Sequence, residues 1–255
     1  MLTAIPWLLA SLALGGIPVT PADAQEIAHL SSHWTYEGAL GPDYWGSLNP
    51  AYGSCAQGVN QSPINLKGFI EAELPPIDFA YHGQGSEIYN TGHGIQVNFP
   101  PATAAIRIDD ITFELKQCHF HAPAEHLIDD KVFAMEAHFV HADPDGHLAV
   151  VALMMQEGEA NNPALDNLWR ELPHRADGPH PLSAPFFAQS LLPVDRDYVR
   201  YNGSLTTPPC TEGVRWLVLK QAIPVSAEQV KRFTSIMMHP NNRPVQPINA
   251  RPVLR

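Results

Sequence analysis

Three histidines on two strand-like runs constrain the fold of this chain more than any other feature. His119 and His121 close the run 117–121, and His138 follows Glu136 in a later run of similar character. Residues two apart on a β-strand point to the same side of the sheet. The three imidazoles therefore meet only if the two runs are neighbouring strands whose histidine-bearing faces lie on one side.

Strict alternation along both runs predicts which side chains share that side. On the first strand these are Phe113, Leu115, Gln117, His119 and His121. On the second strand they are Val132, Ala134, Glu136, His138 and Val140. Three neutral imidazoles leave the fourth position of a tetrahedral zinc open, which is typical of a catalytic rather than a structural site.

The residues around the histidines favour a metal site over unrelated surface or core histidines. Histidine is common in this chain, with 13 residues, so one pair two apart carries little weight. Gln117 and Glu136, however, each precede a histidine by two residues and so share its face. Metal-bound imidazoles usually donate their second N–H to a carbonyl or carboxylate. We therefore predict a zinc site on His119, His121 and His138 with Gln117 and Glu136 behind it.

Length and charge limit the remaining function classes. The chain has 255 residues, enough for one large domain or two small ones. The formal net charge is −11 and no basic run occurs, so nucleic-acid binding is not expected.

The pattern of elements predicts a single strand-dominated domain of the α+β class. Strand-like runs separated by Gly, Pro, Asn and Asp turns are typical of antiparallel β-structure. They are residues 87–89, 94–99, 105–108, 112–121, 132–141, 148–156 and 214–219. Two short helices are expected at 163–172 and 226–237, and Ser226 and Gln229 have the spacing of a capping box at the start of the second.

The N-terminus predicts a signal peptide. Residues 4–17 are almost wholly apolar, and Ala22-Asp23-Ala24 fits the small-x-small cleavage pattern. We expect residues 1–24 to be removed and 25–255 to form the mature domain, in the periplasm or outside the cell. No Lys or Arg precedes the apolar stretch, so a buried N-terminal helix is the alternative. No later stretch is long and apolar enough to span a membrane.

The chain has three cysteines, and in an oxidising compartment two of them are expected to pair. Cys118 alternates away from the metal face on a central strand, so a buried thiol is expected there. Cys55 and Cys210 lie in turn-rich segments, and we predict a disulfide between them.

Nine short motifs occur in one order along residues 33–254. They are His33-Trp34-x-Tyr36-x-Gly38, Gly41-Pro42-x-x-Trp45, Gln61-Ser62-Pro63-Ile64-Asn65, Gly92-His93, Gln117-x-His119-Phe120-His121, Glu125-His126, Glu136-x-His138, Gly203-Ser204-Leu205-Thr206-Thr207-Pro208-Pro209, and Asn241-Asn242-Arg243-Pro244-x-Gln246-Pro247. Together they make the chain resemble the α-class carbonic anhydrases of the secreted bacterial type. The resemblance implies a large twisted, mainly antiparallel sheet with a conical cavity and zinc at its base. It also implies the Cys55–Cys210 disulfide and cis peptide bonds before Pro63 and Pro209.

The activity that the resemblance implies is the zinc-dependent, reversible hydration of carbon dioxide to bicarbonate and a proton by a zinc-bound hydroxide. Thr206 would accept the hydroxide proton and donate its own to Glu125, since a hydroxyl does both and an ionised carboxylate only accepts. His93, between two glycines, matches the proton shuttle, and Tyr36 matches a residue that orders the water chain. Many bacterial members of the family form dimers, which makes a homodimer one possible state, but no interface can be identified in this sequence.

The remaining cavity positions include both matches and departures. The substrate-binding positions of the family correspond to Val140, Val150, Leu205, Thr207, Val214 and Trp216. Two polar positions that are often Asn in the family are Thr91 and Gln96 here. Both remain polar, so a water network is still expected.

Two other functions are compatible with some of these motifs. His119-x-His121-x-x-x-Glu125 fits the first cupin motif, in which the glutamate would be a metal ligand. Against a cupin, Val132 stands where the motif requires Gly, and the second cupin motif is not found. The other alternative is a non-catalytic zinc-binding module of the carbonic anhydrase fold.

Overall fold

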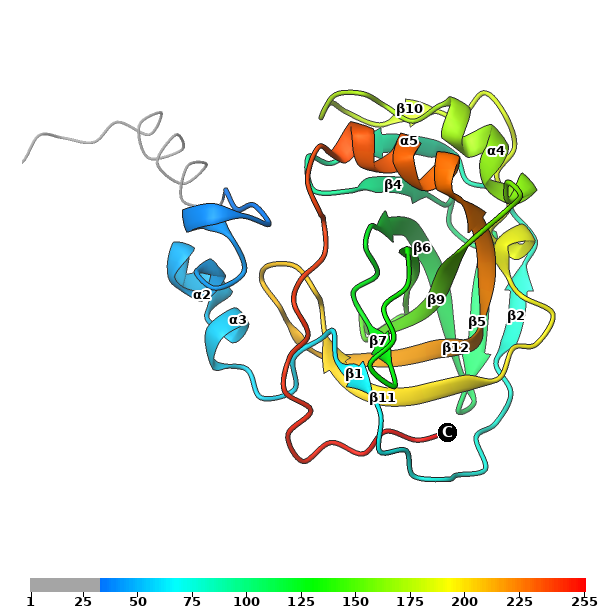
Figure 1. Cartoon of the computed structure of the whole chain (residues 1–255). Coiled ribbons are helices and arrows are strands. Elements are labelled where there is room, and N and C mark those ends of the chain that lie inside the picture. The colour runs from blue at the N-terminus through cyan, green and yellow to red at the C-terminus, as the bar shows by residue number, and fades with distance from the viewer. Residues whose placement is uncertain (1–32) are drawn as a thin grey trace, which may run out of the picture. The chain divides into compact units, whose positions relative to one another are not determined.

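The computed structural model describes residues 33–255 (Figure 1). The chain divides into two units, residues 1–33 and 34–255, and the second unit holds every element discussed below. The predicted signal peptide and its cleavage site lie outside the described residues. Within residues 33–255, no helix has the length and apolar character needed to cross a membrane.

A ten-stranded mixed sheet forms the framework of the second unit. Its main path runs β10-β3-β4-β6-β8-β9-β12-β11, while β2 pairs with β5 and β5 also pairs with β6. The strands are β2 (Asp78–Tyr81), β3 (Glu87–Asn90), β4 (Ile95–Asn98), β5 (Ala104–Ile108), β6 (Ile111–His121), β8 (Met135–Ala142), β9 (Leu148–Gly158), β10 (His180–Pro181), β11 (Tyr198–Ser204) and β12 (Glu212–Ser226). Only β9 and β12 pair in parallel in this sheet; β1 (Asn65–Leu66) and β7 (Leu127–Ile128) form a separate parallel pair. The predicted strand-dominated α+β class is confirmed.

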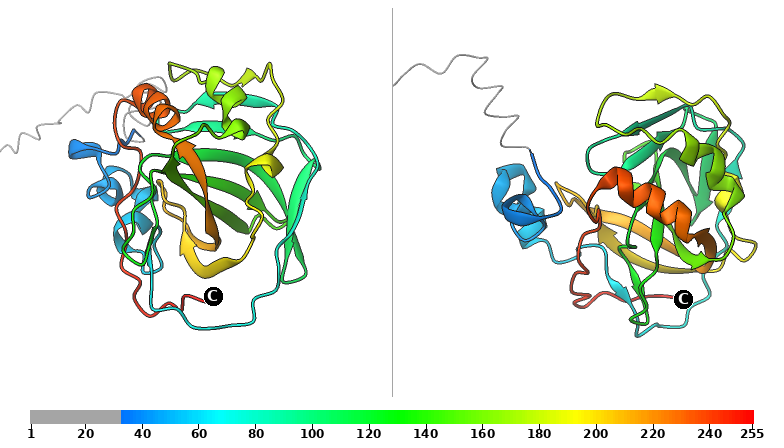
Figure 2. Two further views of the ribbon diagram at one scale, coloured as in Figure 1. Left: turned by 45° about the vertical axis from the view of Figure 1, so that its right-hand side comes forward. Right: turned by 45° about the horizontal axis from the view of Figure 1, so that its top comes forward.

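Two helices cover the face of the sheet opposite the predicted metal site. They are α4 (Pro163–Arg170) and α5 (Ala227–Met237), which lie side by side in Figures 1 and 2. Their apolar residues, including Trp169 and Phe233, belong to the larger of two core clusters. The predicted capping box is present at the start of α5, where Ser226 Oγ accepts from Gln229 N. The other helices of residues 33–255 are single turns: η1 (Gly38–Leu40), α2 (Trp45–Leu48), η2 (Pro50–Tyr52), α3 (Ser54–Gln57) and η3 (Ala188–Leu191).

The alternation predicted for β6 is wrong at its first half. The register with β8 shifts between Leu115 and Gln117, so that Lys116 is an extra residue in the strand. Such a bulge reverses the side to which the following residues point. Phe113 and Leu115 therefore pack in the α4/α5-side core with Cys118, while Gln117 faces the other way.

The second predicted strand also begins too early. Val132 is 60% exposed and lies before β8, which starts at Met135. The reason is a turn at Asp129 and Asp130, both with positive φ, which returns the chain from β7. Ala134 accordingly packs against the α4/α5-side core and not on the metal face.

The cysteine predictions are confirmed. Cys55 and Cys210 form a disulfide with a Cα–Cα distance of 5.0 Å, and Cys118 is a buried free thiol. Cis peptide bonds precede Pro63 and Pro209 as the resemblance implied, and a third, not predicted, precedes Pro123.

Candidate metal centre

The three histidines of the sequence motif meet on one face of β6 and β8. These strands are antiparallel neighbours, with His119 opposite His138 and His121 opposite Glu136. One nitrogen from each of the three rings lies within 4.8 Å of the others. The neighbouring-strand arrangement required by the sequence is therefore present.

Hydrogen bonds on the outer side of each ring determine which nitrogen faces the centre. His119 Nδ1 lies 2.8 Å from Gln117 Oε1, and His121 Nδ1 lies 2.7 Å from the backbone oxygen of Asn241. His138 differs, since its Nε2 lies 2.7 Å from Glu136 Oε1. Because each of these acceptors needs a ring N–H, the lone pairs belong to Nε2 of the first two histidines and Nδ1 of the third.

These inward lone pairs fit a zinc ion. His121 Nε2 is buried and has no hydrogen-bond partner among the described residues, a costly state for a polar atom unless a ligand satisfies it. Three neutral imidazoles, each with its second nitrogen bonded to a carbonyl or carboxylate, are the donor set expected for catalytic zinc.

Burial and charge tune the three rings differently. Burial, with His121 and His138 nearby, holds the pKa of His119 well below its usual value. Burial also lowers the pKa of His121, although the Glu125 carboxylate opposes this. For His138, burial acts downward but the Glu136 carboxylate outweighs it, so this pKa is raised. A raised pKa means a more basic ring, and hence a stronger donor to a metal.

Glu136 connects the histidine site to the loop after β6. Its Oε2 accepts from the backbone N–H groups of Glu125 and His126, each at 2.8 Å. Its Oε1 lies 2.7 Å from both His126 Nδ1 and His138 Nε2. Burial opposes its ionisation, but His126 and His138 overcome this and hold the Glu136 pKa well below its ordinary value. Glu136 is therefore an ionised, fully bonded support for the site.

A buried chain of polar groups extends from there to the loop that carries Thr206. His126 Nε2 lies 2.6 Å from Tyr201 Oη, which lies 2.8 Å from Ser62 Oγ. Ser62 Oγ in turn accepts from Ser204 N at 3.0 Å. A second set of potential metal ligands lies close together here: His126, Glu136 and His138. Both histidines already hydrogen-bond to Glu136 Oε1, so these atoms have partners without a metal ion.

The hydrogen bond from Thr206 to Glu125 that the resemblance implied is not formed. Glu125 Oε1 accepts from Arg243 N at 2.8 Å. Its Oε2 is buried without a hydrogen-bond partner in the described part of the chain and turns toward the imidazoles, 3.6 Å from His121 Nε2 and 3.9 Å from His138 Nδ1. Thr206 is 5% exposed, in the loop between β11 and β12.

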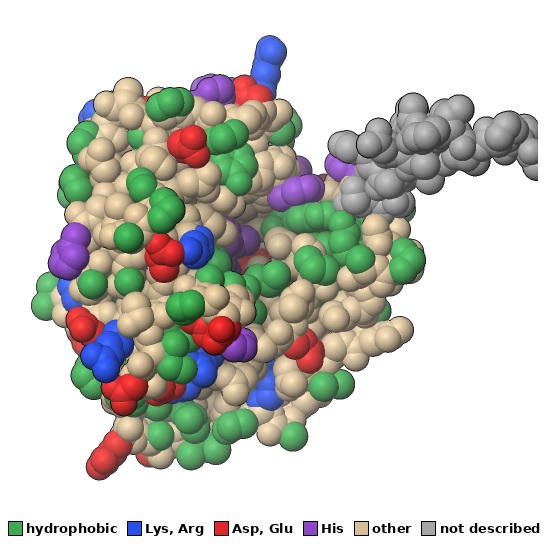
Figure 3. Space-filling view, turned by 180° about the vertical axis from the view of Figure 1, so that it is seen from behind, with side chains coloured by type: hydrophobic (Ala, Val, Ile, Leu, Met, Phe, Trp, Pro, Cys, Tyr) green, Lys and Arg blue, Asp and Glu red, His purple; other side chains and the backbone are tan. Residues whose placement is uncertain are grey.

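A cavity of about 240 Å³ leads to two of the histidines. Figure 3 shows a hollow in this face of the molecule with histidine side chains inside it and at its edge. Residues from four separate segments line the cavity: Trp34, Tyr36, Thr91, His93, Gly94, Gln96, Gln117, His119, His121 and Thr207. The expected shuttle residue His93 is half-buried there and stacks on Trp34, with ring centroids 3.6 Å apart.

The two departures from the family pattern, Thr91 and Gln96, both line this cavity. Gln96 lies opposite His119 in the sheet, but its amide donates to Asn98 Oδ1 at 2.8 Å. Tyr36 is buried, and burial together with the Glu125 charge raises its pKa well above the ordinary value, so it stays a neutral phenol.

The expected apolar wall lies beside the metal group rather than along this cavity. Val140, Val150 and Trp216 are paired across β8, β9 and β12 on the face that carries His138. The Trp216 ring lies 4.9 Å from the His138 ring. Val214 and Leu205 pack in the same apolar cluster.

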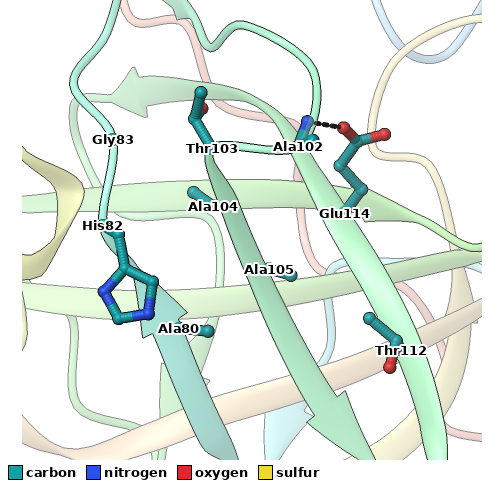
Figure 4. Close-up of a pocket in the computed structure, with 9 residues that line it drawn as sticks. All are labelled: Ala80, His82, Gly83, Ala102, Thr103, Ala104, Ala105, Thr112 and Glu114. Carbon is teal, nitrogen blue, oxygen red and sulfur yellow. Dashed lines mark hydrogen bonds between the residues drawn. The ribbon is translucent and has the colours of Figure 1, made fainter.

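A wider depression lies elsewhere, on the outer face of β2, β5 and β6 (Figure 4). Its volume is about 550 Å³, and Ala80, Ala105 and Gly83 are among its lining residues. Its single carboxylate, Glu114, accepts from Ala102 N. A third group of metal-type donors, Asp143, Asp145 and His147, lies in an exposed turn where Asp143 accepts from the backbone N–H groups of the other two.

Sequence reasoning missed two residues that support the site. Asn241 supplies the oxygen that orients His121, and Arg243 binds both Glu125 and the segment at Gln61. Both belong to the motif at 241–247, but no spacing rule connects them to β6, more than a hundred residues earlier in the chain.

Comparison with known proteins agrees with this geometry. A sequence model of eukaryotic-type carbonic anhydrase matches residues 40–255. The chain is 47% identical over 224 residues to a carbonic anhydrase of Pectobacterium carotovorum, covering 88% of this chain and 91% of that one. It is 43% identical over 246 residues to one of Klebsiella pneumoniae, covering 96% of each. The structure of the α-carbonic anhydrase of Thermovibrio ammonificans with sulfanilamide superposes with a TM-score of 0.85 at 43% identity, covering 88% of this chain and 99% of that one.

Proposed function

Because the chain belongs to the α-carbonic anhydrase family, an enzyme family whose function is carbon dioxide hydration, we propose that the cavity that leads to His119 and His121, with His138 beside them, is its active site. The observation that carries the assignment is the set of three inward imidazole nitrogens, each fixed by an outer hydrogen bond. Family membership replaces the cupin alternative, in which Glu125 would be a metal ligand.

His119 Nε2, His121 Nε2 and His138 Nδ1 would hold the zinc, with Gln117, Glu136 and the Asn241 carbonyl orienting the rings. When bound, zinc supplies a nucleophile at neutral pH by lowering the pKa of a water ligand, chemistry for which carbonic anhydrases are the standard example. Everything else in the reaction concerns orientation, substrate access and proton removal, which the chain's own residues provide.

Thr206 and Glu125 would orient the reacting oxygen. Glu125 Oε2 is a buried acceptor without a partner in residues 33–255, and a buried acceptor strongly favours any donor within reach. The Thr206 hydroxyl is the donor proposed by resemblance. Once it donates to Glu125, it can only accept from the reacting group, which fixes where that group's lone pair points.

Carbon dioxide is small and apolar, so it needs an apolar surface and no charged clamp. Val140, Val150 and Trp216, in register beside His138, offer that surface, with Leu205 and Val214 packed alongside and Thr207 at the cavity side. This placement supports their role as the substrate wall.

His93 would carry the released proton away. It lines the cavity together with two of the proposed ligands, His119 and His121, and its ring stacks on Trp34. Imidazole titrates near neutral pH, which suits a proton relay. Tyr36, a neutral phenol in the same cavity, can both donate and accept in a water chain between the two ends.

The Cys55–Cys210 disulfide supports an oxidising location for the protein. Together with the apolar N-terminal stretch, it supports a signal peptide over residues 1–24 and a periplasmic or secreted enzyme.

The deciding experiment is stopped-flow carbon dioxide hydration by the purified mature protein before chelation, after zinc removal and after zinc is restored. Hydration that disappears on chelation and returns with zinc would support the reaction and the three-histidine site together. Stoichiometric zinc without hydration would contradict the proposal and favour a non-catalytic zinc-binding module of the same fold.

A further inference from the structure

The turn that carries His93 is held far more tightly than its flanking glycines suggest. Gly92 adopts a positive φ of 83°, which explains that glycine. The turn itself is closed by a hydrogen bond from Thr91 N to the backbone oxygen of Gly94, at 2.9 Å. In addition, Asn90 Oδ1 accepts from Gly92 N at 2.8 Å.

The Thr91 hydroxyl lies inside this turn. It accepts from the backbone N–H of His93 at 3.2 Å and from that of Gly94 at 3.0 Å. It also lies 3.1 Å from the Gly94 carbonyl oxygen, to which it donates. The hydroxyl is therefore committed to the backbone around His93 and not to solvent in the cavity.

Asn241 holds the other side of the same residue. Its amide nitrogen donates to the backbone oxygen of His93 at 3.2 Å and to that of Phe120 at 2.9 Å. Its amide oxygen accepts from Ala122 N at 2.9 Å. Asn241 is fully buried, and its own backbone oxygen is the one that orients His121.

We infer that Thr91 and Asn241 are positioning residues that clamp the backbone of His93 and so set where its imidazole stands in the cavity. The N–H of His93 is bound on one side and its C=O on the other, while its ring stacks on Trp34. Asn241 also ties this turn to the end of β6, where the proposed ligand His121 lies. The inference rests on the proposed function of His93 as the proton shuttle.

The clamp makes a specific kinetic prediction. In the proposed reaction the proton is lost after bicarbonate has formed and left, so a defect in proton transfer would lower kcat and leave kcat/KM unchanged. In Thr91→Val, the two backbone N–H groups lose their acceptor while the side chain keeps its shape. We expect kcat at low buffer concentration to fall by about threefold to tenfold. Losing one ordinary hydrogen bond reduces by that factor the fraction of molecules in which His93 is correctly placed. Added imidazole, which can carry the proton itself, should restore kcat.

The test compares five variants of the zinc-loaded mature protein, Thr91→Val among them, by stopped-flow hydration at low and high imidazole. Thr91→Ser keeps the hydroxyl and should behave like the unmodified protein. Thr103→Val is the matched control, since the Thr103 hydroxyl also binds a turn carbonyl, that of Pro100, outside the metal cavity. Asn241→Ala, with rates normalised to bound zinc, should repeat the Thr91→Val pattern. The fifth substitution is His93→Ala.

The outcomes distinguish the proposed shuttle role of His93 from the clamp on its backbone. If His93→Ala lowers kcat but Thr91→Val does not, the shuttle stands and the clamp is wrong. If His93→Ala leaves kcat unchanged at low buffer, both the shuttle and the clamp are wrong. A parallel fall of kcat and kcat/KM in Thr91→Val, not rescued by imidazole, would show a general structural defect and overturn the clamp.

Discussion

The two ends of the proposed active-site cavity are built in different ways. At the metal end, His119, His121 and His138 lie on adjacent strands, and their outer nitrogens have hydrogen-bond distances of 2.7–2.8 Å. At the other end, the rim (His93, Trp34 and Tyr36), His93 lies on a turn and stacks on Trp34, which is distant in sequence. Metal binding needs donors at fixed positions, and the proposed ligands accordingly lie on paired strands. The proposed proton shuttle lies instead on a turn whose backbone is bound by Thr91 and Asn241.

The largest effect expected from this difference is in the response to losing a histidine. His138→Ala removes a donor from the metal centre, so zinc affinity should fall by at least about 10³-fold, more than is typical for losing an outer partner. Hydration should disappear with the zinc. His93→Ala should instead keep full zinc and lower kcat by about 10- to 100-fold, the low end for a positioned acid or base.

Zinc content and initial hydration rates of the two variants provide the measurement. A His138→Ala protein that keeps stoichiometric zinc would contradict the assignment of that ligand. Loss of zinc from His93→Ala would show that the two ends are not separable.

Loss of the disulfide should lower the stability of the protein but change its zinc affinity little. Cys210 packs with Trp34, Tyr36 and Trp45 near the rim, and its bond to Cys55 spans 155 residues. The double substitution Cys55→Ser with Cys210→Ser should lower the free energy of unfolding by about 2–5 kcal/mol.

Urea denaturation measures this loss, and zinc affinity of the folded variant is the comparison. An unchanged free energy of unfolding would contradict the prediction. A large drop in zinc affinity at unchanged fold would mean that the rim supports the metal end directly.

The residues that hydrogen-bond to the outer nitrogens of the proposed ligands should contribute unequally to zinc affinity. Glu136 is ionised and receives four hydrogen bonds, two of them from the backbone of the loop after β6. Glu136→Gln removes the charge and presents N–H groups to donors, so zinc affinity should fall by about 10- to 100-fold. Gln117→Ala removes one neutral hydrogen bond to His119 and should cost about tenfold or less.

Zinc affinity measured by competition with a chelator tests the order of the two variants. A Gln117→Ala variant that loses more zinc affinity than Glu136→Gln would contradict the importance given to the charged partner.

The sequence predicted the metal end of the cavity better than the rim. Alternation with a period of two brought His119, His121 and Glu136 to one face because β6 after its bulge and β8 are both regular. It failed for Phe113 and Leu115 because strict alternation was carried through the bulge at Lys116. The sequence does mark the bulge, since Lys116 and Gln117 are two successive polar residues between the apolar positions 113 and 115 and the apolar positions 118 and 120. The rim contacts of His93 with Trp34 and Asn241 join segments that no periodicity connects, so they follow only from the folded structure.

A second histidine of β8 gives the smallest but most specific test of what distinguishes a metal-site histidine. His141 is fully buried three residues after His138, and Tyr81 Oη lies 2.7 Å from its Nε2. Its Nδ1 donates to the Ala149 carbonyl at 3.1 Å. Unlike His138, it has no carboxylate partner among the described residues, and burial lowers its pKa to about 3.

Stability should therefore depend on pH through His141. An unfolded histidine has a pKa of about 6.5, so between there and about 3 the unfolded state binds one proton that the folded state does not. The stabilising contribution is complete above the higher value and is lost as pH falls, at about 1.4 kcal/mol per pH unit. His141→Gln should reduce the slope of unfolding free energy against pH by that amount, while the matched change at the exposed His82 should not. An unchanged slope in His141→Gln, measured by urea denaturation from pH 4 to about 6.5, would mean that other groups cause the acid sensitivity of this fold.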